Sequence, residues 1–241
     1  MRTALCMYGQ GGDMRGGYGP SLQNKPGPVN FKACFDSYKE KIIDVNNCDI
    51  FMHTWAVKHE KILRNLYQPK KAIFEPQKVF VKIQNKAIAA RSRWYSTQQV
   101  LRLKKQYEEE NNFKYDWVML LRYDVIFFTE IDFSKFKPEY FYVSNMNMCP
   151  SRPITIEKTP KLFGRITHPD NITFDLKIIE DLWMFSNSNY MDIFSTLYDY
   201  LDEYGKAFNK AAYSPHTGMW FHLCKFIGNP HHGKVKYVFR K

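Results

Sequence analysis

Charged residues interrupt an apolar segment of the sequence at a place where they could bind an ion or a ligand. Arg122, Tyr123 and Asp124 follow the apolar run Trp117 to Leu121, and a second apolar run, Val125 to Phe128, comes directly after them. An arginine and an aspartate at such a break are costly to bury without partners. We therefore expect both side chains to face a partner, an ion or a ligand.

A glycine-rich stretch, Tyr8 to Gly17, could bind an anion, because glycine lets the backbone approach a ligand closely and exposes N–H groups. From it we take Gly9, Gln10 and Arg15 as candidate ligand contacts. The stretch is neither a Walker loop, since no Gly-Lys-Ser/Thr follows, nor a dinucleotide loop, since the order G-x-G-x-x-G is missing. A flexible hairpin without a ligand is the alternative.

Three further basic side chains could contact a nucleotide. His53, followed by Trp55, comes at the carboxyl end of a predicted strand, Cys48 to Met52, where it could stack on or hydrogen-bond to a base. A structural histidine is the alternative. Arg91 and Arg93 lie on or beside the apolar stripe of a predicted helix, and arginine suits bidentate phosphate contacts. We expect one of the two, not both, to bind phosphate.

The C-terminal half contributes acids and histidines. Glu180 and Asp181 precede the apolar residues Leu182 to Phe185. Four of the seven histidines lie in the tail: His216, His222, His231 and His232. No H-x-x-x-H pair occurs, so the pattern does not indicate a self-contained metal site, but one histidine could meet a carboxylate from elsewhere in the chain.

Apolar runs and helical periodicity predict the elements that would position these residues. The predicted strands are Thr3 to Met7, Cys48 to Met52, Ala72 to Glu75, Tyr115 to Phe128, Tyr140 to Ser144, an apolar strand within Ile178 to Asn187, and Lys234 to Arg240. The predicted helices are Phe31 to Ile43, Lys82 to Asn111 with a charged, solvated C-terminal end, Met191 to Tyr204, and Trp220 to Ile227. The segment Asn145 to Phe174 has no clear period and suits a lid or binding loop. This order predicts an α/β domain whose polar residues gather at one sheet edge.

Composition narrows the class of protein. The 241 residues suit one large domain or one domain with a small lobe. A net charge of +11 predicts an anionic partner or, alternatively, a solvated basic surface. The five cysteines are scattered, which favours a reducing compartment over a disulfide framework. No segment has the length of a membrane helix, and the first residues are too weakly apolar for a signal peptide, so we expect a cytoplasmic protein.

Four local features resemble a nucleotide-sugar glycosyltransferase of the GT-A fold, of the kind found in capsule and lipopolysaccharide clusters and in some large DNA viruses. They are the segments ALCMYGQ, CDIFMHTW, Ser92 to Asp124, and EDLWMF from Glu180 to Phe185. The resemblance implies a Rossmann-like, mixed and mainly parallel sheet flanked by helices. It also implies a single domain, 1–241, in which about 1–128 bind the nucleotide sugar and about 129–241 bind the acceptor.

The resemblance implies roles for the charged residues. Asp124, with His231 or His232, would hold Mn²⁺ or Mg²⁺ against the pyrophosphate of the nucleoside-diphosphate sugar donor. The family usually has Asp-x-Asp where this chain has Arg122-Tyr123-Asp124, so Arg122 would contact phosphate in place of part of the cation's role. Asp181, or Glu180 as second choice, would take the proton of the hydroxyl on a glycan acceptor. The alternative is that both acids only cap a turn.

Two other classes of protein fit parts of the sequence. The segment GQGGDMR with the later Lys25-Pro26 is similar to a sugar-phosphate nucleotidylyltransferase, but that reading needs displaced glycines and leaves RYD and EDLWMF without a role. A nucleic-acid-binding module would suit the positive charge and the 17% aromatic content. Most aromatic residues, however, fall at apolar-periodic positions, which favours a core, so we expect no nucleic-acid partner.

Overall fold

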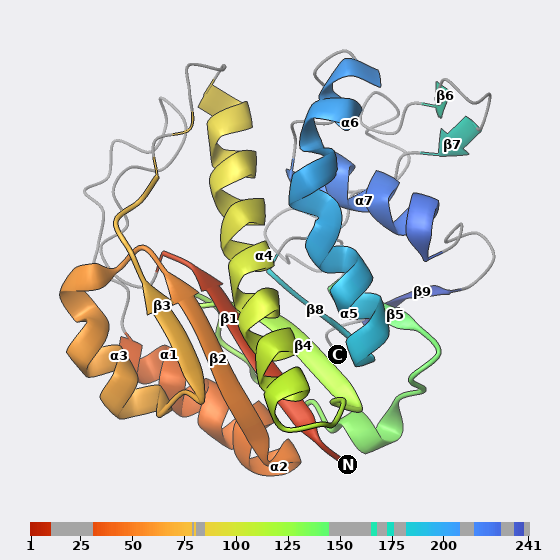
Figure 1. The fold of residues 1–241 in the computed structure, drawn as a ribbon. Helices are drawn as coiled ribbons and strands as arrows, with labels where there is room; N and C mark the ends of the chain where they lie inside the picture. The colour runs from red at the N-terminus through yellow and green to blue at the C-terminus, as the bar shows by residue number, and fades with distance from the viewer. Residues whose placement is uncertain are drawn as a thin grey trace.

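The computed structural model describes residues 1–10, 31–78, 80, 85–144, 165–167, 173–175, 182–207, 215–227 and 234–238. Its centre is a seven-stranded sheet (Figure 1). The strands are β1 (Thr3–Gly9), β2 (Cys48–Thr54), β3 (Lys71–Phe74), β4 (Trp117–Arg122), β5 (Phe141–Ser144), β8 (Trp183–Ser186) and β9 (Val235–Val238). Their order across the sheet is β3-β2-β1-β4-β8-β5-β9, and β8 runs antiparallel to both of its neighbours. The predicted α/β class with a mainly parallel sheet is confirmed.

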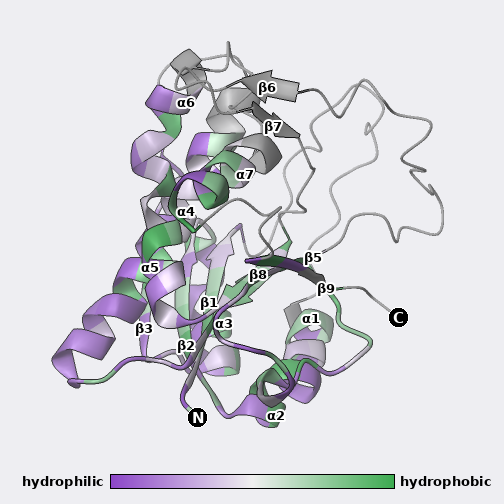
Figure 2. Cartoon of the chain, turned by 90° about the vertical axis from the view of Figure 1, so that its right-hand side faces the viewer, coloured by the Kyte–Doolittle hydropathy of each residue, from purple (hydrophilic) through white to green (hydrophobic). Residues whose placement is uncertain are grey.

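Helices cover both faces of this sheet (Figures 1 and 2). One face carries α4 (Asn85–Glu110), α5 (Ser188–Ser195), a 3-10 segment (Thr196–Tyr200), α6 (Leu201–Ala207) and α7 (Pro215–Phe226). The other carries α1 (Phe31–Tyr38), a π-helical turn (Lys39–Ile43), α2 (Asp44–Asn46) and α3 (Glu60–Tyr67), which follows a 3-10 turn (Val57–His59). Another 3-10 turn (Phe133–Lys135) precedes β5, and β6 (Arg165–Thr167) pairs antiparallel with β7 (Thr173–Asp175).

Side chains of the central strands alternate between two cores, one on each face. Along β1, Ala4, Cys6 and Tyr8 pack toward α4, while Leu5 and Met7 pack toward α1 and α3. All five are buried. Alternation on a strand covered on both faces explains why the run is almost wholly apolar. It also means that a polar residue near the end of a strand faces one helical layer or the other.

The predicted strand Tyr115 to Phe128 is wrong beyond Arg122. β4 ends there, and the chain leaves the sheet, so that Val125 and Phe127 are buried while Ile126 and Phe128 are exposed. Hydroxyl groups of α1 hold this segment, because the Tyr38 hydroxyl accepts a hydrogen bond from Val125 N (2.9 Å) and the Ser37 hydroxyl accepts one from Phe127 N (2.7 Å). These contacts satisfy backbone groups that would otherwise need a strand partner.

Other element boundaries differ from the predictions in smaller ways. The helix predicted to end at Ile43 continues to Asn46 through a π-helical turn, and β2 extends two residues further, to Thr54. The helix predicted from Trp220 begins at Pro215. Strands β6 and β7 fall at the end of the segment predicted to be a loop; its residues 145–164, 168–170 and 171–172 lie outside the described residues. α3 had not been predicted.

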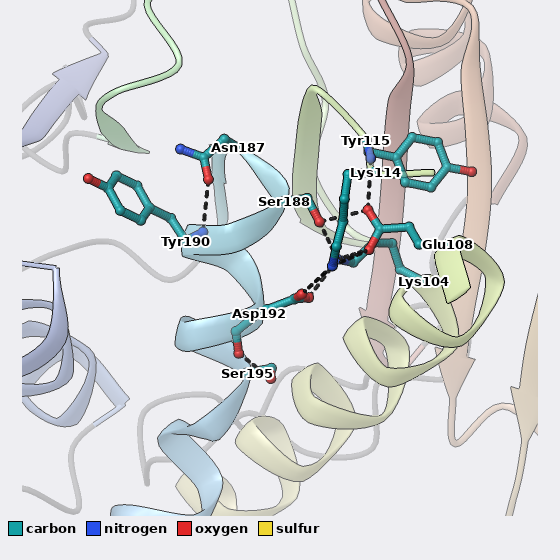
Figure 3. Close-up of polar contacts among 9 residues, drawn as sticks. All are labelled: Lys104, Glu108, Lys114, Tyr115, Asn187, Ser188, Tyr190, Asp192 and Ser195. Atoms are coloured by element: carbon teal, nitrogen blue, oxygen red, sulfur yellow. Dashed lines mark hydrogen bonds and ion pairs between the residues drawn. The ribbon is translucent and has the colours of Figure 1, made fainter. Parts of the chain in front are cut away.

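The charged end of α4 is solvated only in part: Lys105, Gln106 and the residues from Glu109 to Asn112 are exposed as predicted, but two charged residues are not. Lys104 and Glu108 are buried and belong to an ion-pair network that links α4 to the start of α5 (Figure 3). Lys104 donates to Glu108 (3.0 Å), to Ser188 (2.7 Å) and to Asp192 (2.6 Å). Lys114 bonds to both acids, and Glu108 also accepts from the backbone N–H of Tyr115. The charges are buried because each has partners that local sequence does not reveal.

Within the described part of the chain, no helix has both the length and the apolar character needed to cross a membrane. Four cysteines in this part of the chain are free: Cys6, Cys34, Cys48 and Cys224. Cys149 lies outside the described residues.

Candidate functional site

The candidate site lies at the carboxyl ends of β1, β2 and β4. β1 is at the middle of the parallel strands, with β2 on one side and β4 on the other. The chain reaches β2 through α1 on one face of the sheet and enters β4 from α4 on the opposite face (Figure 1). In open α/β sheets, ligands bind outside the carboxyl ends of the strands where such a reversal of order occurs. The geometry of the sheet therefore directs attention to the residues around Gly9 and Arg122.

Three polar or aromatic side chains form a row across the ends of these strands. Tyr8 of β1 is the register partner of His53 in β2 and of Arg122 in β4. Residues in register share a face, and Tyr8 belongs to the core under α4, so the row faces that helix. Arg93 and Ser96 of α4 contact it from above.

Arg93 is fixed by Tyr8 and by its neighbouring ring. Its Nη2 donates to the Tyr8 hydroxyl (2.7 Å), and its guanidinium lies over the ring of Trp94, 4.4 Å from the centroid. Burial lowers the pKa of Arg93 to about 10; Tyr8 and Asp124 oppose this shift, and the charge of Arg122 adds to it. Arg93 therefore stays protonated at neutral pH, with a second guanidinium close enough to repel it.

Arg122 and Asp124 form a bidentate pair. Arg122 Nε donates to Oδ1 of Asp124 (2.8 Å), and Nη2 donates to Oδ2 (2.5 Å). Burial acts to lower the pKa of Arg122, but the hydrogen bonds and charge of Asp124 outweigh it, so the pKa is raised overall. Both side chains reach the surface, with 33% of Arg122 and 21% of Asp124 exposed. The sequence predicts that each of these two residues faces a partner, and in the structure each is the partner of the other.

His53 is part of a buried chain of hydrogen bonds that ends at Gly9. Its Nδ1 lies 2.7 Å from the Ser96 hydroxyl, which accepts from the backbone N–H of Gly9 (2.9 Å), and its Nε2 lies 3.0 Å from Glu75. Because the Glu75 carboxylate can only accept a hydrogen bond, neutral His53 carries its proton on Nε2, and Nδ1 accepts from the Ser96 hydroxyl. Burial lowers the pKa of His53, although Glu75 opposes the shift.

This chain of hydrogen bonds positions the turn that leaves β1. Gly9 has φ of 101°, a conformation that glycine adopts without the strain a side chain would add. His53 and Ser96 are fully buried, and both ring nitrogens of His53 have protein partners. His53 thus holds the backbone at Gly9 rather than meeting a base, which is the structural alternative weighed from the sequence.

A cluster of aromatic rings that was not predicted from the sequence lies beside this chain of hydrogen bonds. Trp55 and Tyr95 stack with an interplanar angle of 20° and centroids 5.6 Å apart, and Tyr95 also contacts Phe80 and Tyr198 edge-on or tilted. Lys78 donates to the Tyr95 hydroxyl and lies over its ring. The signal available in the sequence was Trp55 at the end of a strand, but nothing local connected it to Tyr95 of the long helix.

The remaining predicted site residues are not brought to this place or cannot be assessed. Arg91 pairs with Asp202 of α6, so of the two candidate arginines Arg93 is the one at the strand ends. Gln10 follows Gly9 directly at this edge. The other predicted ligands and acids lie outside the described residues: Arg15, Glu180, Asp181, His231 and His232. Among the residues that the structure does describe, no three His, Cys, Asp or Glu side chains come together as a metal site.

Comparison of the sequence with family models gives no match. Comparison with curated proteins gives no significant match either.

Proposed function

We propose that the chain is a GT-A-type glycosyltransferase that moves a sugar from a nucleoside-diphosphate sugar to a hydroxyl acceptor, such as a glycan. The observation that carries this proposal is the pair of guanidinium groups, Arg93 and Arg122, at the carboxyl ends of β1 and β4. Two arginines beside one carboxylate leave an excess of positive charge at the edge where α/β sheets bind ligands. A diphosphate is a ligand that this charge and the planar guanidinium fork suit.

The sheet order supports the same proposal. Counted along the chain, the strands of the seven-stranded sheet follow the order 3-2-1-4-6-5-7, and the sixth is antiparallel to both neighbours. The first part, 3-2-1-4, matches the first four strands of the Rossmann-type order 3-2-1-4-5-6. One antiparallel strand in an otherwise parallel sheet agrees with the mixed, mainly parallel sheet that the resemblance implies. The strand order supports the fold assignment but is silent on the donor and the acceptor.

The chemistry asked of the arginines follows from the reaction. Breaking the bond between the sugar and a nucleoside diphosphate places negative charge on the departing phosphate oxygens. Arg93 and Arg122 would stabilise that charge, and the hydrogen bond and the ring contact that hold Arg93 before the ligand arrives would reduce the reorganisation needed. The stacked rings of Trp55 and Tyr95, both partly exposed, supply a surface for the base. Asp181 remains our proposed base for the acceptor hydroxyl, with Glu180 second.

The resemblance also implies Mn²⁺ or Mg²⁺ at Asp124. In the described residues Asp124 does not fit this role while it is paired, because both of its oxygens accept hydrogen bonds from Arg122 and the guanidinium charge beside them repels a cation. A divalent cation with His231 or His232 stays a proposal of the resemblance alone. We derive no step through a cation.

A binding panel followed by an assay of turnover tests the proposal. Nucleoside diphosphates and nucleotide sugars are screened by thermal shift, since a specific ligand raises the apparent melting temperature. We expect one nucleotide series to stabilise the chain, and its sugar form to be hydrolysed slowly to the nucleoside diphosphate when water replaces the acceptor. Pyrophosphate release from a nucleoside triphosphate and a sugar phosphate would instead identify a nucleotidylyltransferase. Binding of oligonucleotides in place of nucleotide sugars would also contradict the proposal.

Arg93→Gln and Arg91→Gln are a matched pair of variants for this panel. Both remove one guanidinium from α4, but only Arg93 contacts the row of strand ends, whereas Arg91 pairs with Asp202. We expect Arg93→Gln to weaken nucleotide binding by about tenfold or more, as loss of a charge-assisted contact does, and Arg91→Gln to leave it within about twofold. Equal effects of the two substitutions would argue against a diphosphate at Arg93.

A further inference from the structure

We propose that Arg122 is a partner-exchanging arginine: it pairs with Asp124 in the free protein and turns to a phosphate of a bound diphosphate, so that diphosphate binding requires no divalent cation. This inference rests on the proposed function for the identity of the natural ligand. It goes beyond it by assigning the charge compensation to Arg122 and Arg93 of this chain. It also assigns Asp124 the role of holding Arg122 in the absence of ligand.

The Arg122–Asp124 pair has the bidentate geometry of a contact between a guanidinium group and a phosphate. Arg122 donates two hydrogen bonds, from Nε and Nη2, to the two carboxylate oxygens of Asp124. They use the edge of the guanidinium that also fits two oxygens of a phosphate. A phosphate can thus replace the carboxylate without a change in the type of contact. The residues are separated by one position in the sequence, at the point where β4 ends, so the exchange does not require movement of the sheet.

Both side chains of the Arg122–Asp124 pair are partly exposed to solvent. About a third of the Arg122 side chain and a fifth of the Asp124 side chain are open to solvent. Separating such a pair costs less than separating a fully buried pair, because water can solvate both partners as they part. By contrast, the buried Lys104–Glu108 pair has no access to solvent on either side chain and is not able to exchange partners in this way. The exposure of the Arg122–Asp124 pair makes exchange practicable.

The charges of Arg93, Arg122 and Asp124 do not cancel. Arg93, Arg122 and Asp124 act on one another and on Tyr8 at electrostatic range. The guanidinium of Arg93 is held by Tyr8 on the same face of the sheet as Arg122, the register partner of Tyr8. With one carboxylate for two guanidinium groups, the set of Arg93, Arg122 and Asp124 carries an excess positive charge. A diphosphate brings at least two negative charges and would neutralise this excess, while released Asp124 is solvated.

The rival account keeps Asp124 as a ligand to a divalent cation that bridges it to the diphosphate. The two accounts predict opposite signs for one substitution. If Asp124 competes with phosphate for Arg122, then Asp124→Asn frees Arg122 and tightens diphosphate binding. If Asp124 holds the cation, the same substitution weakens binding, because amide oxygen is a poorer ligand than carboxylate for Mg²⁺ or Mn²⁺.

The experiment is calorimetric titration of the full chain with inorganic pyrophosphate, once with a chelator and once with Mg²⁺. Pyrophosphate is the probe because it needs no knowledge of the base or the sugar. The variants are Asp124→Asn, Arg122→Gln, Arg122→Lys and, as the control, Arg91→Gln. Circular dichroism and the melting temperature of each variant establish that it is folded. Arg122→Lys keeps the charge but loses the bidentate geometry, so it separates a specific contact from general attraction.

We expect wild type to bind pyrophosphate in chelator, Asp124→Asn to bind about threefold or more tighter, and Arg122→Gln to bind about tenfold or more weaker. Arg122→Lys should fall between wild type and Arg122→Gln, and Arg91→Gln should match wild type. Binding that appears only with Mg²⁺ and is weakened by Asp124→Asn overturns the exchange but leaves the proposed glycosyltransferase function standing. Absence of binding to pyrophosphate and to every nucleoside diphosphate, with or without Mg²⁺, contradicts both.

Discussion

Tyr8 in β1 and Arg122 in β4 are opposite each other in the parallel pairing of the two strands, and the hydroxyl of Tyr8 accepts a hydrogen bond from Arg93 of the helix above. Through Tyr8, the helix α4 and the end of β4 bring two guanidinium groups to one edge of the sheet. The pairing follows from strand register alone. The hydrogen bond from Arg93 gives a role to the tyrosine at the penultimate position of β1, because its hydroxyl can bind a cationic group.

Tyr8→Phe should loosen Arg93 without disturbing the sheet. The substitution keeps the ring and removes only the acceptor of the 2.7 Å hydrogen bond. We expect nucleoside diphosphate affinity to fall about fivefold, because a hydrogen bond to a charged group contributes roughly 1 kcal/mol or more. Calorimetric titration measures this. The control is Tyr107→Phe at the other end of α4, and a loss of affinity as large in the control would contradict the role given to Tyr8.

Ser96→Ala should destabilise the turn after β1. It removes the acceptor of the Gly9 N–H, which is half-buried, and the partner of His53 Nδ1, which is buried. A buried polar group left without a partner costs about 1 to 3 kcal/mol. Urea unfolding should therefore show a free energy of unfolding lower by about 2 kcal/mol. Gln106→Ala, at an exposed position of the same helix, should change it by less than about 0.5 kcal/mol. Equal stability of the two variants would show that the hydrogen-bond chain is not needed.

Lys104→Met should cost more stability than any surface substitution. Lys104 is buried among Glu108, Ser188 and Asp192, and its removal leaves a buried carboxylate with only Lys114 as a cationic partner among the contacts described (Figure 3). Breaking a buried ion pair by removing one partner costs about 3 to 5 kcal/mol. The matched control is Lys105→Met, since Lys105 is exposed on the next position of α4. A cost below about 1 kcal/mol in denaturant unfolding would mean that the network is dispensable.

His222 should make the fold sensitive to acid. Burial lowers the pKa of His222 from 6.5 to about 4; Ile193 O opposes this shift and Lys225 adds to it. Asp199 and Glu203 also oppose it, and the Tyr204 hydroxyl bonds to the ring. The unfolded state therefore binds a proton that the folded state does not between about pH 6.5 and pH 4. Stability is unaffected above pH 6.5 and falls with decreasing pH at about 1.4 kcal/mol per pH unit, for a total of roughly 3 kcal/mol.

The measurement is the free energy of unfolding of wild type and His222→Gln at pH values from 7 to 4. Glutamine keeps donor and acceptor groups but does not titrate, so its curve should be flatter over this range. Other groups that titrate, His53 among them, contribute equally to both proteins and cancel in the difference. Identical pH dependence of the two proteins would contradict a buried neutral His222.

The sequence predicted those elements whose burial is periodic or continuous. The strands β1, β2 and β4 are largely apolar runs covered on both faces, and such runs can be recognised as strands without knowledge of their partners. The stripe Ala90, Trp94 and Leu101 is buried at helical spacing in α4, as predicted. The mainly parallel sheet followed from the alternation of these strands with helices.

The features that local sequence did not predict depend on distant partners. Val125 to Phe128 looks like the continuation of a strand, and only Ser37 and Tyr38, more than 80 residues earlier, take it out of the sheet. Lys104 and Glu108 look like part of a solvated helix end, and their burial depends on Ser188 and Asp192 of α5, about 80 residues later, together with Lys114. At the candidate site, Arg122 and Asp124 were singled out correctly as a charged break, but that they pair with each other was not foreseen.

A crystal structure of the chain with the nucleoside diphosphate that stabilises it most tests the central claim most directly. The account predicts the diphosphate at the carboxyl ends of β1 and β4, with phosphate oxygens about 2.7 to 3.2 Å from the guanidinium nitrogens of Arg93 and Arg122. Asp124 should have lost at least one of its two hydrogen bonds to Arg122. A nucleotide bound elsewhere on the chain, with the Arg122–Asp124 pair unchanged, would contradict the account.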